Sequence, residues 1–455
     1  MKKHAICIGG WLAATLLFFL VQPPEEALGA RAIAPKRVLV VTVTKGFHHS
    51  SIGTGEKILE ELAAKSGLFA VDFARTDEEM AQKMTVAALP NYGAVIFANT
   101  SGDLPLPDKD AFLKWIASGK GFVGIHAAND TFRGRKPLDP FVLMLGAEFK
   151  SHGPEAEVEV LNQDRRHPAC KNYPPTFRIF DEIYLMNAFQ RSRVHGLLTL
   201  DKHPNTGVPG DYPIAWCRMH GNGRVFYTSL GHREDVWASP DYQQHLLGGI
   251  KWALRLERGN ALPQDAAYRV GLAEAGRGFK ALFNGVNLAG WKLRDPAGRQ
   301  SWSAQNGMLV NEMSDKEPGN DLVTLDSFRD FILRYEYMIP KTGNSGVYLR
   351  GRHEIQILDD FEKGKPEIGS NGALYSIAAP AKFASRKPGQ WQQAEATIKD
   401  NRVTVILNGV KVLDNVVADR PTGGELDAHL DASGPIMLQG NHGPVAFRNL
   451  RIKPL

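Results

Sequence analysis

The chain has 455 residues, of which 43% are hydrophobic, and a formal net charge of +5. This length suffices for two or more domains, each able to bury its own core. The small positive excess is spread along the chain, which argues against a nucleic-acid partner.

The N-terminus has the three-part pattern of a secretory signal peptide. Lys2 and Lys3 precede an apolar run over about residues 5–21, and small residues follow around residues 27–32. The pattern predicts a signal peptide over residues 1–30, and hence a periplasmic or secreted protein without stable membrane insertion after cleavage. An uncleaved anchor is the alternative, because the run is borderline in length for a membrane span.

Cysteine usage leaves the redox state open. Only Cys170 and Cys217 lie beyond the predicted signal peptide. They permit one disulfide in an exported protein but do not require it.

Residues 36–256 alternate strand-like and helix-like stretches. Strands are predicted near residues 37–43, 69–73, 94–98 and 122–125, and helices near residues 50–67, 108–117 and 240–254. This rhythm predicts an open parallel α/β sheet of flavodoxin-like type, with a hairpin over about residues 214–229.

Histidines follow several of these predicted strands. His49 comes after the first strand, His126 directly after residues 122–125, and His232 after the hairpin. Because ligands of such sheets bind at the carboxyl ends of the strands, we expect the three side chains to converge on one pocket. Imidazoles there could bind a metal or transfer protons, although any one of them could equally be a loop histidine bonded to backbone.

Four motifs in this segment resemble the ThuA-like (trehalose-utilisation) family, a branch of the class I glutamine amidotransferase-like fold. They are TKGFHHS at 44–50, GFVGIHAA at 121–128, FDEIY at 180–184 and SLGH at 229–232. The resemblance implies a candidate rim of His49, His126, Asp181, Glu182 and His232. It implies no glutamine hydrolysis, because His126 stands where true amidotransferases carry a nucleophilic cysteine.

The character of the chain changes after residues 257–277, which we interpret as a linker. From residue 278 to 455, short alternating strands are separated by Gly, Pro, Asn and Asp turns. Eight or more such strands predict an all-β sandwich or jelly roll.

This second half resembles the 3-keto-disaccharide hydrolase domain, a concanavalin-like jelly roll. The motifs that carry the resemblance include LFNG at 282–285, GNSGVYLRG at 343–351, EIQILD at 354–359, GALY at 372–375, GQW at 389–391, GPIMLQ at 434–439 and VAFRN at 445–449. The resemblance implies a small carbohydrate partner whose sugar is oxidised to a ketone at C3. Such a ketone acidifies the C2 proton, so that a base can remove it and the C1 substituent can leave.

Residues 343–360 supply the polar groups that this chemistry needs. Period-two alternation places Tyr348 and Arg350 on one face of a first strand, and Glu354 and Gln356 on one face of a second strand. We therefore predict Glu354 as the base, with Arg350 and Gln356 facing the enolate oxygen. A merely polar hairpin with an Arg350–Glu354 pair is the alternative interpretation.

Further site residues come from the motifs and from strand parity. His442 completes the predicted catalytic set, and a divalent metal could assist it, although no ligand spacing specifies one. The predicted substrate-binding residues are Asn344, Tyr348, Asp359, Trp391, Gln439 and Arg448. Trp291 could also bind sugar, but core packing is the favoured interpretation for it.

Two other functions stay open for this half. It could be a non-catalytic, lectin-like carbohydrate-binding module, because jelly rolls host both kinds of function. It could also be a two-carboxylate glycosidase that uses Glu354 and Asp359. The last hypothesis ranks lowest, because five residues along one strand separate the Cα atoms by about 16 Å.

Overall fold

The computed structural model describes residue 1 and residues 35–263, 272–314, 316–361 and 363–455. The predicted signal peptide and part of the predicted linker therefore lie outside the described residues. Residues Lys36–Leu455 form one compact unit. In this described part, no helix has both the length and the apolar character needed to cross a membrane.

The N-terminal sheet is parallel on one side and antiparallel on the other. Its strand order is β2-β1-β3-β5-β13-β12-β11-β8-β9. The parallel strands are β1 (Lys36–Val41), β2 (Phe69–Ala74), β3 (Ala94–Ala98), β5 (Gly121–Ile125) and β13 (Gly223–Thr228). The antiparallel extension contains β12 (Pro209–His220), β11 (His195–Lys202), β8 (Ala156–Asn162) and β9 (Thr176–Asp181). The predicted parallel α/β sheet is present, and the sheet is mixed because these further strands extend it.

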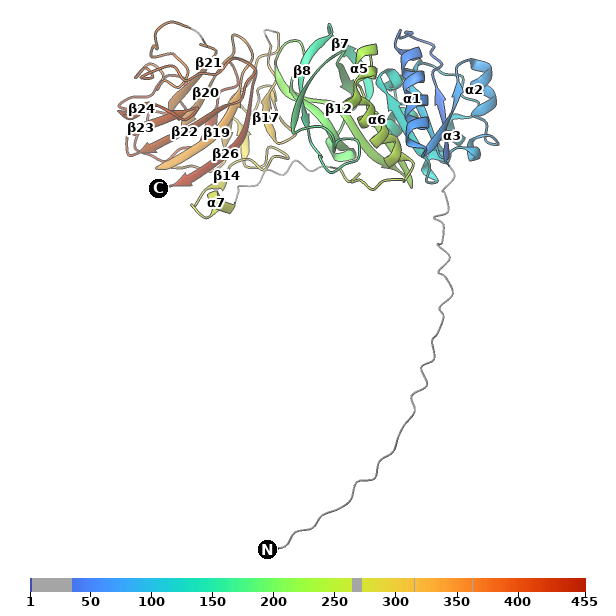
Figure 1. The fold of residues 1–455 in the computed structure, drawn as a ribbon. Coiled ribbons are helices and arrows are strands. Elements are labelled where there is room, and N and C mark those ends of the chain that lie inside the picture. Colours follow the sequence, from blue (N-terminus) through green and yellow to red (C-terminus); the bar gives the residue numbers. More distant parts are fainter. Residues whose placement is uncertain (2–34, 264–271, 315, 362) are drawn as a thin grey trace. The chain divides into compact units, whose positions relative to one another are not determined.

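Two layers of helices bury both faces of the parallel part (Figure 1). Val38 and Val40 pack with Leu59 of α1, whereas Leu39 and Val41 pack on the opposite side with Phe112 of α3. This two-sided burial explains why the first strand is a continuous apolar run. The helices are α1 (Ile52–Ser66), α2 (Asp77–Lys83), α3 (Lys109–Ala117), α4 (Pro140–Leu145), α5 (Glu234–Ala238) and α6 (Pro240–Ala253), with short 3₁₀ turns η1 (Leu89–Asn91), η2 (His126–Asn129) and η3 (Arg191–Arg193).

Small strand pairs lie beside the main sheet. They are β4 (Ser101–Gly102) with β6 (Asp130–Thr131), and β7 (Glu148–His152) with β10 (Tyr184–Asn187). Cys170 and Cys217 are both free and buried, so the structure contains no disulfide between them.

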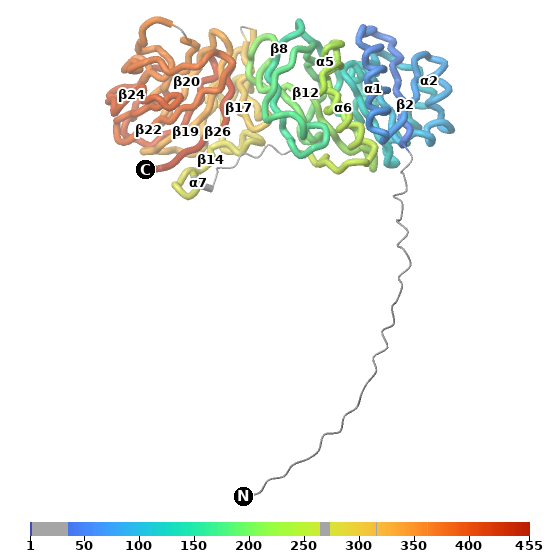
Figure 2. The backbone as a smooth tube through the Cα atoms, in the orientation of Figure 1, coloured from blue at the N-terminus to red at the C-terminus, as the bar shows by residue number. Residues whose placement is uncertain are grey.

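The second half consists of two antiparallel sheets that share one core. The larger sheet has the order β16-β17-β26-β19-β22-β23-β24, with β14 paired to β26, and the smaller has the order β15-β18-β25-β20-β21. Figure 2 follows the backbone through both sheets. Val347 and Ile355 of the smaller sheet belong to the same hydrophobic cluster as Leu333 and Val405 of the larger sheet, as expected for a β-sandwich.

The bounds of the strands in this half are as follows. The larger sheet contains β14 (Lys280–Ala281), β16 (Trp302–Gln305), β17 (Met308–Asn311), β19 (Phe331–Met338), β22 (Gln392–Lys399), β23 (Arg402–Leu407), β24 (Val410–Val417) and β26 (Val445–Pro454). The smaller contains β15 (Trp291–Leu293), β18 (Leu322–Thr324), β20 (Asn344–Leu349), β21 (His353–Leu358) and β25 (Met437–Leu438), and a short helix α7 (Leu272–Ala275) precedes both.

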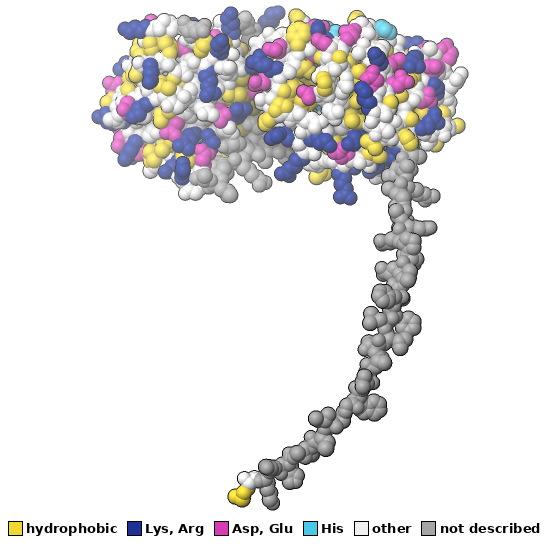
Figure 3. All heavy atoms as spheres, in the orientation of Figure 1, with side chains coloured by type: hydrophobic (Ala, Val, Ile, Leu, Met, Phe, Trp, Pro, Cys, Tyr) yellow, Lys and Arg dark blue, Asp and Glu magenta, His cyan; other side chains and the backbone are white. Residues whose placement is uncertain are grey.

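The surface carries a mixture of charges. Figure 3 shows basic and acidic side chains interspersed over the face in view. This distribution matches the small net charge of the sequence.

Candidate active site

The hairpin β20–β21 positions Glu354 on the face of the smaller sheet that points away from the core. Tyr348 lies opposite Glu354 in the antiparallel register, and Gly346 lies opposite Gln356. Val347, Ile355 and Ile357 point into the core instead. The period-two pattern of the sequence therefore produces the polar face expected for this hairpin.

Glu354 is a buried carboxyl group held by a hydrogen bond. Its side chain is 3% exposed, and its Oε2 accepts a hydrogen bond from the Tyr348 hydroxyl at 2.9 Å. Gln439 in turn donates to the Tyr348 hydroxyl at 3.3 Å. Burial raises the pKa of Glu354 from 4.5 to about 7, and the charge of Asp321 adds to the effect, whereas the Tyr348 hydrogen bond opposes it. A carboxylate with a pKa near neutrality is well suited to act as a general base.

A polar cavity of about 260 Å³ opens beside Glu354. Five other residues predicted for the site line it, namely Asn344, Tyr348, Gln356, Gln439 and His442. Its size suits a single sugar ring better than a long chain. The structure thus brings together most of the residues predicted from the GNSGVYLRG, EIQILD and GPIMLQ motifs.

Two amide oxygens in this cavity have no hydrogen-bond partner among the described residues. They are Asn344 Oδ1 and Gln439 Oε1, and both are buried. A buried acceptor without a partner is costly, so native proteins rarely leave one unless a ligand or water fills the place. Both oxygens can accept hydrogen bonds from sugar hydroxyl groups.

Arg350 lies elsewhere, which corrects its predicted position facing the substrate. It follows β20 with a φ of 54°, so the strand alternation no longer fixes the direction of its side chain. Its guanidinium donates to the carbonyls of Arg329 and Leu430 and to the Asp330 carboxylate. Arg350 is 1% exposed and does not line the cavity, so the structure gives it a structural role.

Three predicted substrate-binding residues also lie outside the cavity. Asp359 accepts a hydrogen bond from the Thr342 backbone, and is therefore engaged in the turn before β20. Trp391 packs against the larger sheet with the Arg448 guanidinium 3.9 Å from its ring centroid, and Arg448 pairs with Glu336. Trp291 is 6% exposed and belongs to the core.

Arg294, Asp321 and Tyr375 line the cavity but were not predicted from the sequence. Arg294 pairs with Asp321 at 3.1 Å, and Asp321 also accepts from the Gly440 backbone at 3.0 Å. Arg294 follows β15 and Asp321 precedes β18, so antiparallel pairing of these strands brings them together. Tyr375 could have been predicted, because it belongs to the GALY motif at 372–375. Arg294 and Asp321 belong to no motif that could have identified them.

Gly346 leaves space for the Glu354 carboxylate because it has no side chain. A Cβ atom at residue 346 would lie 2.1 Å from Glu354 Oε1, so Gly346→Ala must displace the carboxylate. If Glu354 is the base predicted from the sequence, we expect this variant to lose about 100-fold in turnover, because small misplacements of a reacting group have effects of that size. Gly364→Ala is the matched control, since nothing lies within 4 Å of a Cβ there. Steady-state kinetics on a 3-keto-glycoside checks both variants, and equal activity would contradict this role of Gly346.

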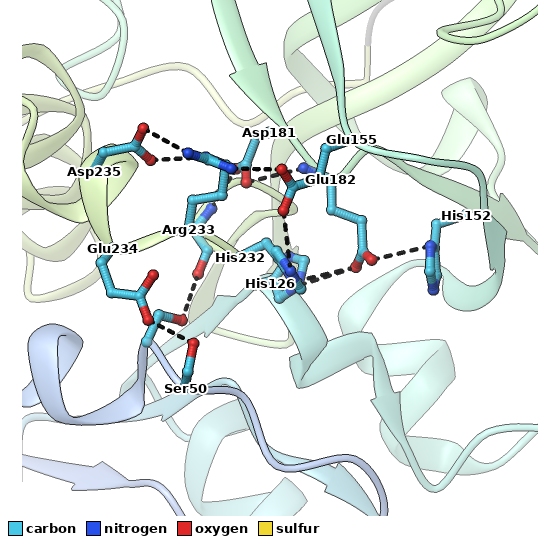
Figure 4. Close-up of polar contacts among 12 residues, drawn as sticks. Ser50, His126, His152, Glu155, Asp181, Glu182, His232, Arg233, Glu234 and Asp235 are labelled. Carbon is cyan, nitrogen blue, oxygen red and sulfur yellow. Dashed lines mark hydrogen bonds and ion pairs between the residues drawn. The ribbon is translucent and has the colours of Figure 1, made fainter.

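The N-terminal half contains a second polar cluster, at the carboxyl ends of its strands. His49, His126, Glu182 and His232 each offer one ligand-type atom, and these atoms lie within 4.8 Å of one another. Asp181 is buried behind them and accepts hydrogen bonds from the backbone amides of Glu182 and Gly231. Figure 4 shows His126, His152 and His232 around Glu182. The structure therefore brings the five predicted rim residues together.

An α/β domain with this rim is followed by a β-sandwich with a buried carboxylate in a sugar-sized cavity, and family models match the two halves. Residues 37–253 match the ThuA model, described as trehalose utilisation. Residues 278–453 match the model of the 3-keto-alpha-glucoside-1,2-lyase-like domain. The chain is thus a ThuA domain followed by a 3-keto-disaccharide hydrolase-type domain.

Several individual proteins are similar to parts of the chain. A protein of Bacteroides thetaiotaomicron named 3-keto-disaccharide hydrolase is 25% identical over 233 residues, covering 39% of this chain and 79% of that protein. A crystal structure from Bacteroides uniformis described as thua-like is 26% identical, with a TM-score of 0.42, and covers 49% of this chain and 93% of its own. A Parabacteroides distasonis crystal structure described as a glycosyl hydrolase is 28% identical, with a TM-score of 0.33, over 39% of this chain and 84% of its own.

Proposed function

We propose that this protein cleaves glycosides whose sugar has been oxidised to a ketone at C3, with Glu354 as the base. The observation that carries the proposal is a buried carboxyl group, with its pKa raised to about 7, in a polar cavity of about 260 Å³. The name of the B. thetaiotaomicron relative and the description of the matching family model agree with this substrate class.

The reaction proceeds through an enolate. Glu354 takes the proton from C2, and the electrons of the C2–H bond form a C2–C3 double bond while the C3 oxygen becomes negative. The enolate then re-forms the carbonyl, a C1–C2 double bond forms, and the bond from C1 to the aglycone oxygen breaks. Addition of water across the resulting enone gives the free 3-keto sugar, so the sum of the steps is hydrolysis.

The residues around Glu354 have distinct tasks in this scheme. Burial raises the pKa of Tyr348, which therefore stays protonated and holds the base by its hydrogen bond. Arg294 supplies the positive charge of the cavity for the developing enolate, the task predicted for Arg350. His442 is exposed and lines the cavity, where it can give a proton to the departing oxygen.

Incubation with a 3-keto-glucoside and with its unoxidised parent tests the proposal. We expect release of the aglycone from the keto substrate only, because only a carbonyl at C3 makes the C2 proton acidic enough for a carboxylate base. Chromatography of the released aglycone measures the outcome.

The other interpretations give different results in the same experiment. Binding without cleavage would support the carbohydrate-binding module. Cleavage of both substrates would support a two-carboxylate glycosidase, in which Asp321 rather than Asp359 would be the second carboxylate of the cavity.

A further inference from the structure

The rim of the ThuA domain gathers four side chains from four separate segments. His49 lies in the loop after β1, His126 begins η2 directly after β5, Glu182 follows β9, and His232 follows β13. The rings of the three histidines lie edge-on to one another, with centroid separations of 4.8 to 5.3 Å. Their nitrogens therefore point toward a common space.

The hydrogen bonding of His126 determines which of its nitrogens faces that space. Its Nδ1 is 2.7 Å from the Ser229 carbonyl oxygen and must donate to it. The lone pair of a neutral ring then sits on Nε2, which is buried without a hydrogen-bond partner among the described residues. Metal-binding histidines typically use this arrangement, in which one nitrogen donates to a carbonyl and the other binds the ion.

Glu182 faces two of the histidines without forming hydrogen bonds to them. Its Oε2 is 3.6 Å from His126 Nε2 and 3.4 Å from His232 Nδ1. His49 Nδ1 and His232 Nδ1 are also buried without hydrogen-bond partners in the described part of the chain. Electron-rich atoms that converge in this way without hydrogen bonds leave a place for a cation.

Two neighbouring residues, His152 and Asp181, fix the position of Glu182. Its Oε1 pairs with His152 Nδ1 at 2.9 Å, which leaves Oε2 for the central space. Asp181 accepts hydrogen bonds from Glu182 N at 3.0 Å and from Gly231 N at 2.8 Å. One buried carboxylate thus fixes the backbone that carries Glu182 and the backbone beside His232.

We propose that His49, His126, His232 and Glu182 together bind one divalent transition-metal ion of the zinc type. Three imidazoles and one carboxylate suit Zn²⁺, Co²⁺ or Ni²⁺, whereas Mg²⁺ and Ca²⁺ prefer all-oxygen sets. The site goes beyond the proposed function, since none of its residues belongs to the Glu354 cavity.

The ion has one accessible side. A cavity of about 330 Å³ is lined by His49, Glu182 and His232, and by Phe47, Arg133 and Tyr184. His126 is fully buried and does not line this cavity. We infer that an oxygen atom of a small hydroxy-carbonyl compound can bind the ion from this cavity, beside the Arg133 cation and the aromatic rings.

Metal titration of the full-length protein tests the site. Protein stripped with a chelator should take up about one Co²⁺ or Zn²⁺ per chain, measured by calorimetry and by the visible absorption of Co²⁺. His126→Ala should weaken metal binding by at least about 100-fold. Loss of a residue that merely hydrogen-bonds to a metal ligand already costs about 10-fold to 100-fold, and His126 is proposed as a ligand itself.

Two further variants keep the result interpretable. Glu182→Gln preserves the shape of the side chain and should also weaken binding, even if His126→Ala fails to fold. His48→Ala removes an exposed histidine next to His49 and should bind like the wild type. If the wild type binds either metal no more tightly than Glu182→Gln, the site does not exist.

A separate experiment tests whether a small ligand can reach the metal ion from the cavity. Acetohydroxamate, a small chelator with two adjacent oxygens, should change the Co²⁺ absorption of the loaded wild-type protein. An unchanged spectrum would show that the four side chains enclose the ion completely, and would contradict a ligand-binding role.

Discussion

Glu354→Gln should lower the turnover of a 3-keto-glycoside by about 100-fold to 10,000-fold, the usual effect of removing a general base. Gln has the size of Glu and can still accept the Tyr348 hydrogen bond at 2.9 Å, so binding of the sugar should change little. Single-turnover kinetics with the keto substrate measures the loss, and calorimetry of sugar binding measures what remains.

The pH dependence of the wild type should carry the signature of the same group. Glu354 acts as a base only without its proton, and its pKa is raised to about 7. kcat/KM should therefore rise with pH through about 7 and level off above it.

The same pKa determines how Glu354 affects stability. The folded protein holds the proton more tightly than the unfolded chain, so the contribution of Glu354 to stability is lost as the pH rises from 4.5 to about 7. The shift corresponds to about 3 kcal/mol. Above pH 7 the ionised, buried Glu354 therefore destabilises the folded protein. Gln carries no charge and avoids this penalty, so Glu354→Gln should be less active than the wild type and more stable at pH 8.

Glu317→Gln is a matched control, because Glu317 is exposed and its one ion-pair partner among the described residues is Arg299 at the surface. It should leave both the turnover and the pH profile unchanged. If Glu354→Gln kept the turnover of the wild type, another residue would have to be the base. A variant that failed to fold would show that Glu354 is chiefly a structural partner of Tyr348.

The sequence predicted the part of this site that depends on local strand geometry. Tyr348 and Glu354 face each other because alternation and a short turn determine the register of one hairpin. Arg350 breaks the pattern because it already belongs to the turn, where a φ of 54° redirects its side chain. Arg294 and Asp321 enter from other strands, and no local pattern reveals such a partner.

In the rim of the ThuA domain too, some residues could be predicted from the strand pattern and others could not. His49, His126 and His232 could be grouped from sequence because they follow strands of one parallel sheet, β1, β5 and β13, whose carboxyl ends lie at one edge. Glu182 follows β9, an antiparallel strand of the extension that the sequence pattern did not predict. The family resemblance rather than periodicity identified it.

Arg350→Met should destabilise the protein by about 3 kcal/mol and thereby separate a structural arginine from a catalytic one. Removing one partner of a buried ion pair typically costs 3–5 kcal/mol, and we take the lower end because Asp330 is 23% exposed. The change also leaves the carbonyl groups of Arg329 and Leu430 without their guanidinium donors. Urea unfolding at constant pH measures the difference.

Two other arginines make this experiment decisive. Arg299→Met removes an exposed pair with Glu317 and should change stability by less than about 1 kcal/mol. Arg294→Met removes the cation that lines the Glu354 cavity together with its pair with the buried Asp321, so it should lower both stability and the turnover of the keto substrate, and turnover is compared per folded protein. If folded Arg350→Met instead kept its stability and lost turnover, the guanidinium would have to reach the substrate in a conformation different from the one in which it binds Asp330.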